Sequence, residues 1–264
     1  MRGAPSFCFN RAIVRRPAKS AVRGLRAVER GAPDYNSLLQ EHDAYVAALA
    51  AAGVDVVILP ALESFPDSVF VEDPALVFPE GAILLRPGAP SRLGEAGEIA
   101  PALRDQFETV LDLPEPGFAD GGDILTTAKG VMIGLSSRTD QAGAEGLLQC
   151  LAQLGRESWI VATPEGVLHF KTDCSLLDEE TILTTKRLAR SGVFEGFETV
   201  IIPEGEELAA NALRVNDIVM VGVDFPRTIE MLDKRGYNVV SMNTSEIGKI
   251  DAGLSCMSLR WRRA

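Results

Sequence analysis

The stretch EDPALVFPEGAILL, residues 72–85, has a plan that recurs three times along the chain: an acidic or amide residue, a short apolar strand, a polar turn and a second apolar strand. The later copies are GDILTTAKGVMIGL (122–135), TDCSLLDEETILTT (172–185) and ANALRVNDIVMVGV (210–223). The leading polar residues are Asp73, Asp123, Asp173 and Asn211, at intervals of 50, 50 and 38 residues. Repeats of this length are typical of units that stack or form a ring.

Helical stretches lie between these hairpins. The sequence predicts a helix over 34–53, with Asp34 as its N-cap and leucines at helical spacing, and a strand directly after it at 54–60. Further helices are predicted over 142–155 and 224–236, with a strand at 237–242. Each helix ends at a glycine, which is the usual C-terminal residue. Hairpins that alternate with helix–strand units indicate an α/β protein.

A fifth unit can be assembled from the two ends of the sequence. LSCMSLRW (254–261) lies about 45 residues beyond the fourth leading residue, and it is expected to pair with RAIVRR (11–16). Five such units favour a β/α propeller with the leading polar residues near its axis, and an open α/β sheet with hairpins is the alternative. The basic segment 9–20 is predicted to be an edge strand; a transit peptide is the weaker interpretation, because no apolar segment follows it.

Composition limits the function classes. The 264 residues are 46% hydrophobic with a net charge of −11, which suits one globular domain over 1–264 with a flexible extension at 1–10. An excess of acids makes a nucleic-acid partner unlikely and is better suited to a small cation. No apolar stretch approaches the length of a membrane span, so we expect no membrane partner. Four cysteines without CxxC spacing indicate a reducing, cytoplasmic setting rather than a disulfide framework.

One cysteine and one histidine are candidates for chemistry. His169 lies just before a repeated polar turn, whereas His42 lies on the apolar stripe of the first predicted helix and is interpreted as structural. Cys256 follows Gly253 and Ser255 and precedes an apolar strand, and the other cysteines have plainer surroundings. A cysteine with a well-placed histidine is a candidate nucleophile and base.

Acidic clusters accompany the strands. Asp67, Glu72 and Asp73 flank one strand, and Asp120 and Asp123 surround a pair of glycines at the matching place in the next repeat. Buried acids need a cationic partner, and for a single acid an arginine or a solvated turn is the simplest one. Two clusters at matching positions instead indicate a cation-binding centre. Since no ligand set has metal spacing, we expect an organic cation and no metal. Two arginines that follow the hairpins, Arg92 and Arg138, are candidates for binding a carboxylate.

Six ordered motifs resemble those of the dimethylarginine dimethylaminohydrolase family, of the guanidine-modifying (pentein) superfamily. They span most of the chain from about 11 to 261 and read SFPDSVFVEDPALV, DGGDIL, SSRTDQAGAE, LHFKTDCS, AANALRVN and KIDAGLSCMSLRW. The resemblance implies a five-bladed β/α propeller of ββαβ units. It also implies hydrolysis of methylated arginine to citrulline through a covalent cysteine intermediate, with no cofactor.

The same resemblance implies roles for individual residues. Cys256 would be the nucleophile, His169 the general acid and base, and Asp120 a carboxylate beside His169. Some bacterial members have glutamate where this chain has Asp120, which puts the substrate range in question. Asp73 would pair with the guanidinium. The other expected substrate-binding residues are Asp67, Glu72, Arg92 and Arg138, with backbone groups of Leu25 and Ile250.

Other functions remain open from the sequence. An arginine deiminase, another alkylguanidine hydrolase or an amidinotransferase would use the same cysteine and histidine. A propeller that binds a partner without catalysis is the alternative from another class, and the combination of Cys256, His169 and acids argues against it. These patterns do not fix the preferred guanidine substrate. They do not fix the oligomeric state either, for which a homodimer is one possibility.

Overall fold

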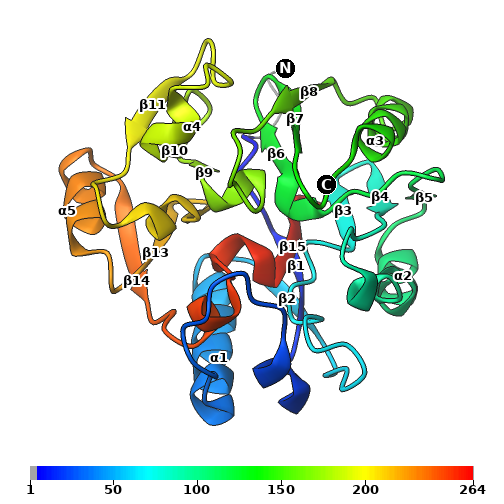
Figure 1. The fold of residues 1–264 in the computed structure, drawn as a ribbon, viewed down its shortest axis with the longest axis horizontal. Coiled ribbons are helices and arrows are strands. Elements are labelled where there is room, and N and C mark those ends of the chain that lie inside the picture. Colours follow the sequence, from blue (N-terminus) through cyan, green and yellow to red (C-terminus); the bar gives the residue numbers. More distant parts are fainter. Residues whose placement is uncertain (1–4, 264) are drawn as a thin grey trace.

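Five three-stranded sheets surround a common axis in the computed structural model, which describes residues 5–263. Figure 1 looks along this axis and shows the helices on the outside of the ring. The prediction of a five-bladed β/α propeller is confirmed, and the open-sheet alternative is excluded. No helix within residues 5–263 is both long and apolar enough to cross a membrane.

Each sheet is built in the same way. An inner antiparallel hairpin is followed by an outer strand parallel to the second hairpin strand, as in the blade where Ile124 faces Ile133 and Ile133 faces Ile160. Four blades are continuous in sequence, and the fifth contains both ends of the chain. The blades are β3 (Ala75–Phe78), β4 (Gly81–Leu84) and β5 (Val110–Asp112); β6 (Ile124–Thr127), β7 (Gly130–Leu135) and β8 (Ser158–Ala162); β9 (Cys174–Leu176), β10 (Thr181–Thr184) and β11 (Glu198–Ile201); β12 (Leu213–Val215), β13 (Ile218–Gly222) and β14 (Asn238–Met242); and β15 (Ser258–Trp261), β1 (Arg11–Arg15) and β2 (Asp55–Leu59).

Helices connect the hairpins to the outer strands. Asp34 caps the first of them, because its side chain accepts a hydrogen bond of 2.8 Å from the amide of Ser37. Gly53 and Gly236 follow two helices with φ of +85°, a conformation that favours glycine. The α-helices are α1 (Tyr35–Ala51), α2 (Glu95–Gln106), α3 (Gln141–Gln153), α4 (Lys186–Ala189) and α5 (Pro226–Lys234). The short 3₁₀ turns are η1 (Lys19–Arg23), η2 (Pro90–Arg92), η3 (Gly121–Asp123), η4 (Phe170–Thr172), η5 (Glu207–Ala210), η6 (Ile247–Ile250) and η7 (Leu254–Met257).

The N-terminal and C-terminal strands close the ring. Trp261 of β15 pairs with Arg11 of β1, as the sequence predicts, and β2 runs parallel to β1 on its other side. The prediction that the basic segment forms an edge strand is wrong, since β1 is the central strand of its blade. Its arginines do not all face solvent: Arg15 is buried and donates to the carbonyl of Pro60 at 3.0 Å.

The segment before β1 also differs from the flexible extension that we expected at 1–10. Residues 1–4 lie outside the described part of the chain, but the residues after them are hydrogen-bonded to the hairpins. The amide of Ser6 donates to Glu179 at 2.8 Å, and the amide of Phe9 donates to Asn216 Oδ1 at 2.9 Å. From Ser6 onward the extension is therefore attached to the ring.

Three of the repeated polar residues link neighbouring blades. Asp73 accepts a hydrogen bond from the amide of Gly122 at 3.1 Å, and Asp123 accepts one from the amide of Phe170 at 2.8 Å. Asn211 accepts one from the amide of Ser255 at 3.0 Å. Each bond ties the 3₁₀ turn of one unit to the leading residue of another. Asp173 departs from this pattern and binds Thr185 and Arg187 of its own unit.

Candidate active site

The 3₁₀ turns at one end of the axis bring the candidate residues together. Asp120 directly precedes η3, His169 directly precedes η4, and Cys256 lies within η7. A cavity of about 140 Å³ opens between these turns and the segments around Leu25 and Ile250. Its lining includes all of the predicted site residues except Glu72, namely Leu25, Asp67, Asp73, Arg92, Asp120, Arg138, His169, Ile250 and Cys256.

Asp120 orients His169. The Oδ2 atom of Asp120 lies 3.0 Å from Nε2 of His169, and its Oδ1 accepts the amide of Gly88 at 2.7 Å. The backbone of Asp120 is held in turn by Thr139, whose hydroxyl accepts its amide at 3.1 Å. Gly122 leaves room for the imidazole, because a Cβ atom there would lie 2.9 Å from Cγ of His169. The ring therefore has a fixed position between a carboxylate and a glycine.

The surroundings of His169 favour its charged form. Burial opposes this, yet the hydrogen bond to Asp120 and the negative charges of Asp123, Asp73 and Asp120 raise the pKa of His169 to about 9. At neutral pH the imidazole is therefore protonated and can donate a proton. This suits a general acid in the first step of a reaction.

The surroundings of Cys256, unlike those of His169, favour the neutral form of the side chain. Burial raises its pKa to about 12, and the charges of Glu72 and Asp73 add to the shift. The backbone fixes the position of Cys256, because its carbonyl accepts the amide of Glu72 at 3.2 Å and its amide donates to Gly253 at 3.3 Å. The residue is held firmly but protonated, so ionisation requires a positive charge close to the sulfur.

The two predicted carboxylate-binding arginines differ. Arg92 is buried and already paired with Asp73 and, at 2.6 Å, with Glu95. Burial raises the pKa of Glu95 to about 7, although the guanidinium of Arg92 pulls it down. Arg138 is half-buried, and no carboxylate of the described residues pairs with it. Of the two, Arg138 is the guanidinium free to meet a carboxylate.

The opposite part of the cavity has a carboxylate beside a backbone turn. Asp67 is buried, and its Oδ1 accepts the amide of Leu25 at 2.8 Å. Burial raises the pKa of Asp67, with Arg92 opposing the shift. Ile250 ends the turn η6 on the facing loop, and its side chain is buried. A carboxylate between two backbone segments can bind an ammonium group.

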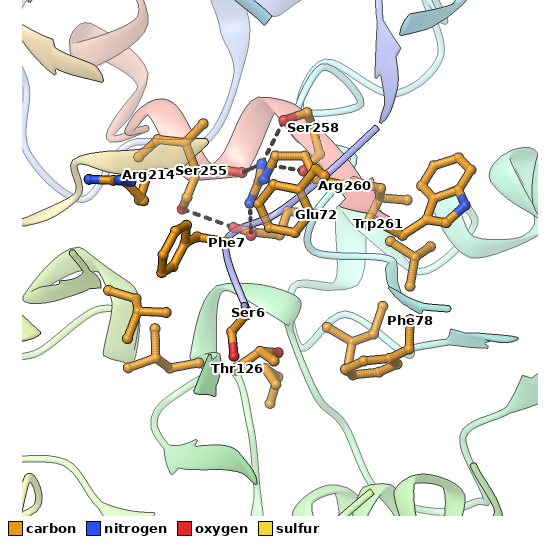
Figure 2. Close-up of a pocket in the computed structure, with 18 of the residues that line it drawn as sticks. Ser6, Phe7, Glu72, Phe78, Thr126, Arg214, Ser255, Ser258, Arg260 and Trp261 are labelled. Carbon is orange, nitrogen blue, oxygen red and sulfur yellow. Dashed lines mark hydrogen bonds and ion pairs between the residues drawn. The ribbon is translucent and has the colours of Figure 1, made fainter. Parts of the chain in front are cut away.

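Glu72 lies beside Cys256 and does not line this cavity. Its carboxylate pairs with Lys171 at 2.5 Å. It also pairs with Arg260 at 3.2 Å and accepts the hydroxyl of Ser255 at 3.0 Å (Figure 2). Sequence reasoning missed Lys171, Ser255 and Arg260 as members of this layer. The available signal was Glu72 itself, since an acid beside a buried apolar stretch needs cationic partners.

Three ligand atoms of the site are close enough together for a metal ion. Asp73, Asp120 and His169 each offer one atom, and these atoms lie within 4.8 Å of one another. Two of the three also bind each other, because His169 and Asp120 share a hydrogen bond, and Asp73 is paired with Arg92. Carboxylates engaged with N–H donors in this way are suited to a planar guanidinium, which donates from several nitrogens.

Comparison with known proteins agrees with this geometry. The arginine deiminase family model matches residues 60–202. The N(G),N(G)-dimethylarginine dimethylaminohydrolase of Pseudomonas aeruginosa is 40% identical, over 96% of this chain and 100% of the relative. The protein of the same name from Streptomyces coelicolor is 33% identical, over 96% of this chain and 97% of the relative.

Solved structures give the same picture. A cysteine-to-serine variant of the Pseudomonas aeruginosa enzyme with citrulline superposes with a TM-score of 0.93 at 40% identity, covering 96% of this chain and 100% of that one. A histidine-to-glycine variant of a dimethylarginine dimethylaminohydrolase, as an adduct with S-methyl-L-thiocitrulline, gives 0.92 at 40% identity, with 96% and 99% covered. The N-terminal domain of the arginine dihydrolase ArgZ from cyanobacteria shares the fold, with a TM-score of 0.83 at 19% identity.

Proposed function

The chain belongs to the dimethylarginine dimethylaminohydrolase family, and from this premise we propose that it hydrolyses Nω-methylated arginine to citrulline and methylamine or dimethylamine. One observation carries the proposal: a cysteine thiol and an imidazole held 3.0 Å from a carboxylate line the same cavity as Asp73, in a chain 40% identical to a named family member. The substrate is a small-molecule guanidine.

We infer that binding is divided between the ends of the substrate. Arg138 meets the α-carboxylate, with Arg92 beside it, and Asp67 together with the backbone at Leu25 and Ile250 meets the α-ammonium. Asp73 pairs with the guanidinium, since a carboxylate has lone pairs for a second donor besides Arg92. Glu72 does not touch the substrate and contributes through the contacts that position Ser255 and the backbone of Cys256.

The charges of the site account for the order of events. Cys256 is a thiol and His169 an imidazolium at neutral pH, because the pKa values are about 12 and about 9. A guanidinium beside the sulfur lowers the pKa of the thiol, so the nucleophile forms when the substrate binds and the proton of the thiol passes to solvent. The proposed thiolate adds to the guanidinium carbon, and the amine leaves with a proton from His169.

The second half of the reaction uses the same histidine. The S-alkylthiouronium on Cys256 is attacked by water, neutral His169 accepts the proton of that water, and loss of the sulfur gives citrulline. Asp120, Asp123 and Asp73 keep His169 charged before the first step, whereas loss of its proton to the amine prepares it as the base for the second step. Covalent catalysis of this kind replaces one difficult step by two easier ones.

The direct test is incubation with asymmetric dimethylarginine, Nω-methylarginine and arginine, followed by measurement of citrulline and of the released amine. We expect citrulline and alkylamine in equal amounts from the methylated compounds. Preferred turnover of arginine with release of ammonia would instead support an arginine deiminase. The match of the arginine deiminase family model to residues 60–202 favours this alternative over other functions.

Two further proposals concern the whole protein. We propose a homodimer, which gel filtration with light scattering tests directly. We also propose a cytoplasmic location, supported by four free cysteines and a net charge of −11. Fractionation of the source cells would show whether the protein follows a cytoplasmic marker.

A further inference from the structure

A second cavity reaches Cys256 from another side. Its volume is about 390 Å³, against about 140 Å³ for the cavity that holds the candidate substrate-binding residues. The two cavities meet at four residues that line both: His169, Asp251, Ala252 and Cys256. The thiol and the imidazole therefore stand between a small cavity and a large one.

The linings of the two cavities differ in chemistry. The small cavity has Asp67 and Arg138, which match the ammonium and carboxylate of an amino acid. Charged residues also line the large cavity, but its arginine and two lysines are already paired: Arg30 with Asp251, Lys171 with Glu72 and Lys249 with Glu246. Its apolar lining includes Leu208, Ala209, Phe225 and Leu254. These side chains suit an alkyl group.

Two features keep this cavity open. A Cβ atom at Gly222 would lie 2.8 Å from the ring of Phe225, so a larger residue there would push the ring from its place. Leu208 lines the cavity and is 48% exposed, which leaves apolar area for a ligand to cover.

Resting on the proposed function, we propose that the large cavity receives the departing amine and its substituents, so that the enzyme also hydrolyses Nω-alkylarginines with groups longer than methyl. The amino-acid end occupies the small cavity, and His169, which protonates the departing nitrogen, lines both. Substituents on that nitrogen then point away from the amino-acid end, into the large cavity.

The chemical step is the same as for the methylated substrate. The sulfur of Cys256 bonds to the guanidinium carbon, the bond from that carbon to the substituted nitrogen breaks, and the nitrogen leaves as an alkylamine with the proton of His169. Water then replaces the sulfur and returns its proton to His169. Only the size of the departing amine changes.

Comparing two substrates tests the inference. Nω-propyl-L-arginine and Nω-methyl-L-arginine release primary alkylamines of similar basicity, so a difference in kcat/KM reports fit rather than chemistry. A pocket too short for its ligand rejects each extra methylene by about tenfold or more, or about a hundredfold for propyl over methyl. We expect kcat/KM for propylarginine to lie within about tenfold of kcat/KM for methylarginine. A propyl-to-methyl ratio of kcat/KM below about one hundredth overturns the inference.

Two matched variants locate the propyl group. Leu208→Trp places a large ring in the cavity from an exposed position, and we expect it to lower the propyl-to-methyl ratio by about tenfold or more while methylarginine turnover is kept. Ile58→Trp makes a similar change on β2, where the side chain is 51% exposed and lines neither cavity, and the ratio should stay as in the wild type.

The outcomes separate the two proposals. An unchanged ratio in Leu208→Trp shows that the propyl group lies elsewhere and overturns the inference. Turnover of methylarginine without propylarginine overturns the inference alone. Absence of turnover with both compounds, in folded wild-type protein, overturns the proposed function and this inference with it.

Discussion

The two ends of the propeller axis differ in their balance of charged side chains. The cavity at the distal end, about 360 Å³ in volume, has five cationic side chains and two carboxylates, and Figure 2 shows Arg214 and Arg260 on its wall. The small catalytic cavity has four carboxylates around a histidine and three arginines. The layer of Glu72, Lys171 and Ser255 lies between them. A net charge of −11 therefore describes neither end, because recognition of a cation depends on where the carboxylates are placed.

The largest expected contrast is between cysteines at the two ends. Cys256→Ser should lower turnover by more than about 10⁴-fold, because a hydroxyl at this position is a far weaker nucleophile than a thiolate. Cys8 lines the distal cavity, and Cys8→Ser should keep nearly full activity. Citrulline formation by both variants is the measurement, and full activity of Cys256→Ser would sink the proposed mechanism.

The two histidines give the next contrast. His169→Gly should lower turnover by ~10²–10⁴-fold while the fold stays intact, and added imidazole should restore part of the rate. His42 is buried in α1, away from the site, and burial lowers its pKa to about 4. His42→Gln should reduce the melting temperature and leave kcat nearly unchanged. A loss of less than about tenfold in His169→Gly contradicts its role in two proton transfers.

Two variants of Asp120 separate the effect of its charge from the effect of its length. Asp120→Asn removes a charged partner of His169 and should cost ~2–5 kcal/mol of transition-state stabilisation on every guanidine. Asp120→Glu keeps the charge with one more methylene, so it should stay active with a shifted ratio of dimethyl- to monomethylarginine. The comparison needs kcat/KM on both substrates for both variants. Wild-type values in Asp120→Asn would make the carboxylate a purely structural one.

The pH profile of kcat/KM measures the charge state of the free site. The reactive pair, a thiolate with an imidazolium, has one proton fewer than the resting pair. Its population therefore rises about tenfold per pH unit until the pH approaches the His169 pKa of about 9. Above the Cys256 pKa of about 12 the imidazolium form is lost and the rate falls. A profile that is flat from neutral pH to about 9 would show that the thiol of the free enzyme is already ionised.

The smallest contrast is between arginines. Arg138→Ala should raise KM by ~10–100-fold with little change in kcat, since it removes a charged hydrogen bond to the carboxylate but no group at the reacting carbon. Arg214→Ala, at the distal end, should change neither constant. Equal KM values for Arg138→Ala and wild type would remove Arg138 from the proposed binding set.

The repeated hairpins, each with its own leading polar residue, favoured the ring over an open sheet, and the motif resemblance implied the five blades. The place of β1 was not predictable from its own residues. Alternating arginines suggested a solvated edge, but Arg11 pairs with Asp55 on β2 and Arg15 is buried by tertiary contacts. Helix α2 was not predicted either, since it contains Gly97 and Pro101, which weaken the helical signal.

The identity of the site residues could be predicted from the sequence, but the ion pairs that they form could not. Motif resemblance named the acids, the thiol and the imidazole, and all but Glu72 line one cavity. The engagement of Arg92 by Glu95 depends on a turn and a burial that no spacing reveals. The ion pairs of Lys171 and Arg260 with Glu72 form where segments distant in sequence meet at the axis, and the local sequence does not predict such contacts.

The pairing of β1 with β15 has a consequence for synthesis. Cys256 and the strand that closes the ring lie within six residues of one another, from Cys256 to Trp261. A nascent chain on the ribosome holds β1 without its antiparallel neighbour β15 until this stretch has left the exit tunnel. Cys256 and the final blade thus arrive together, so a chain that stops short of them has an open ring and no thiol at its axis.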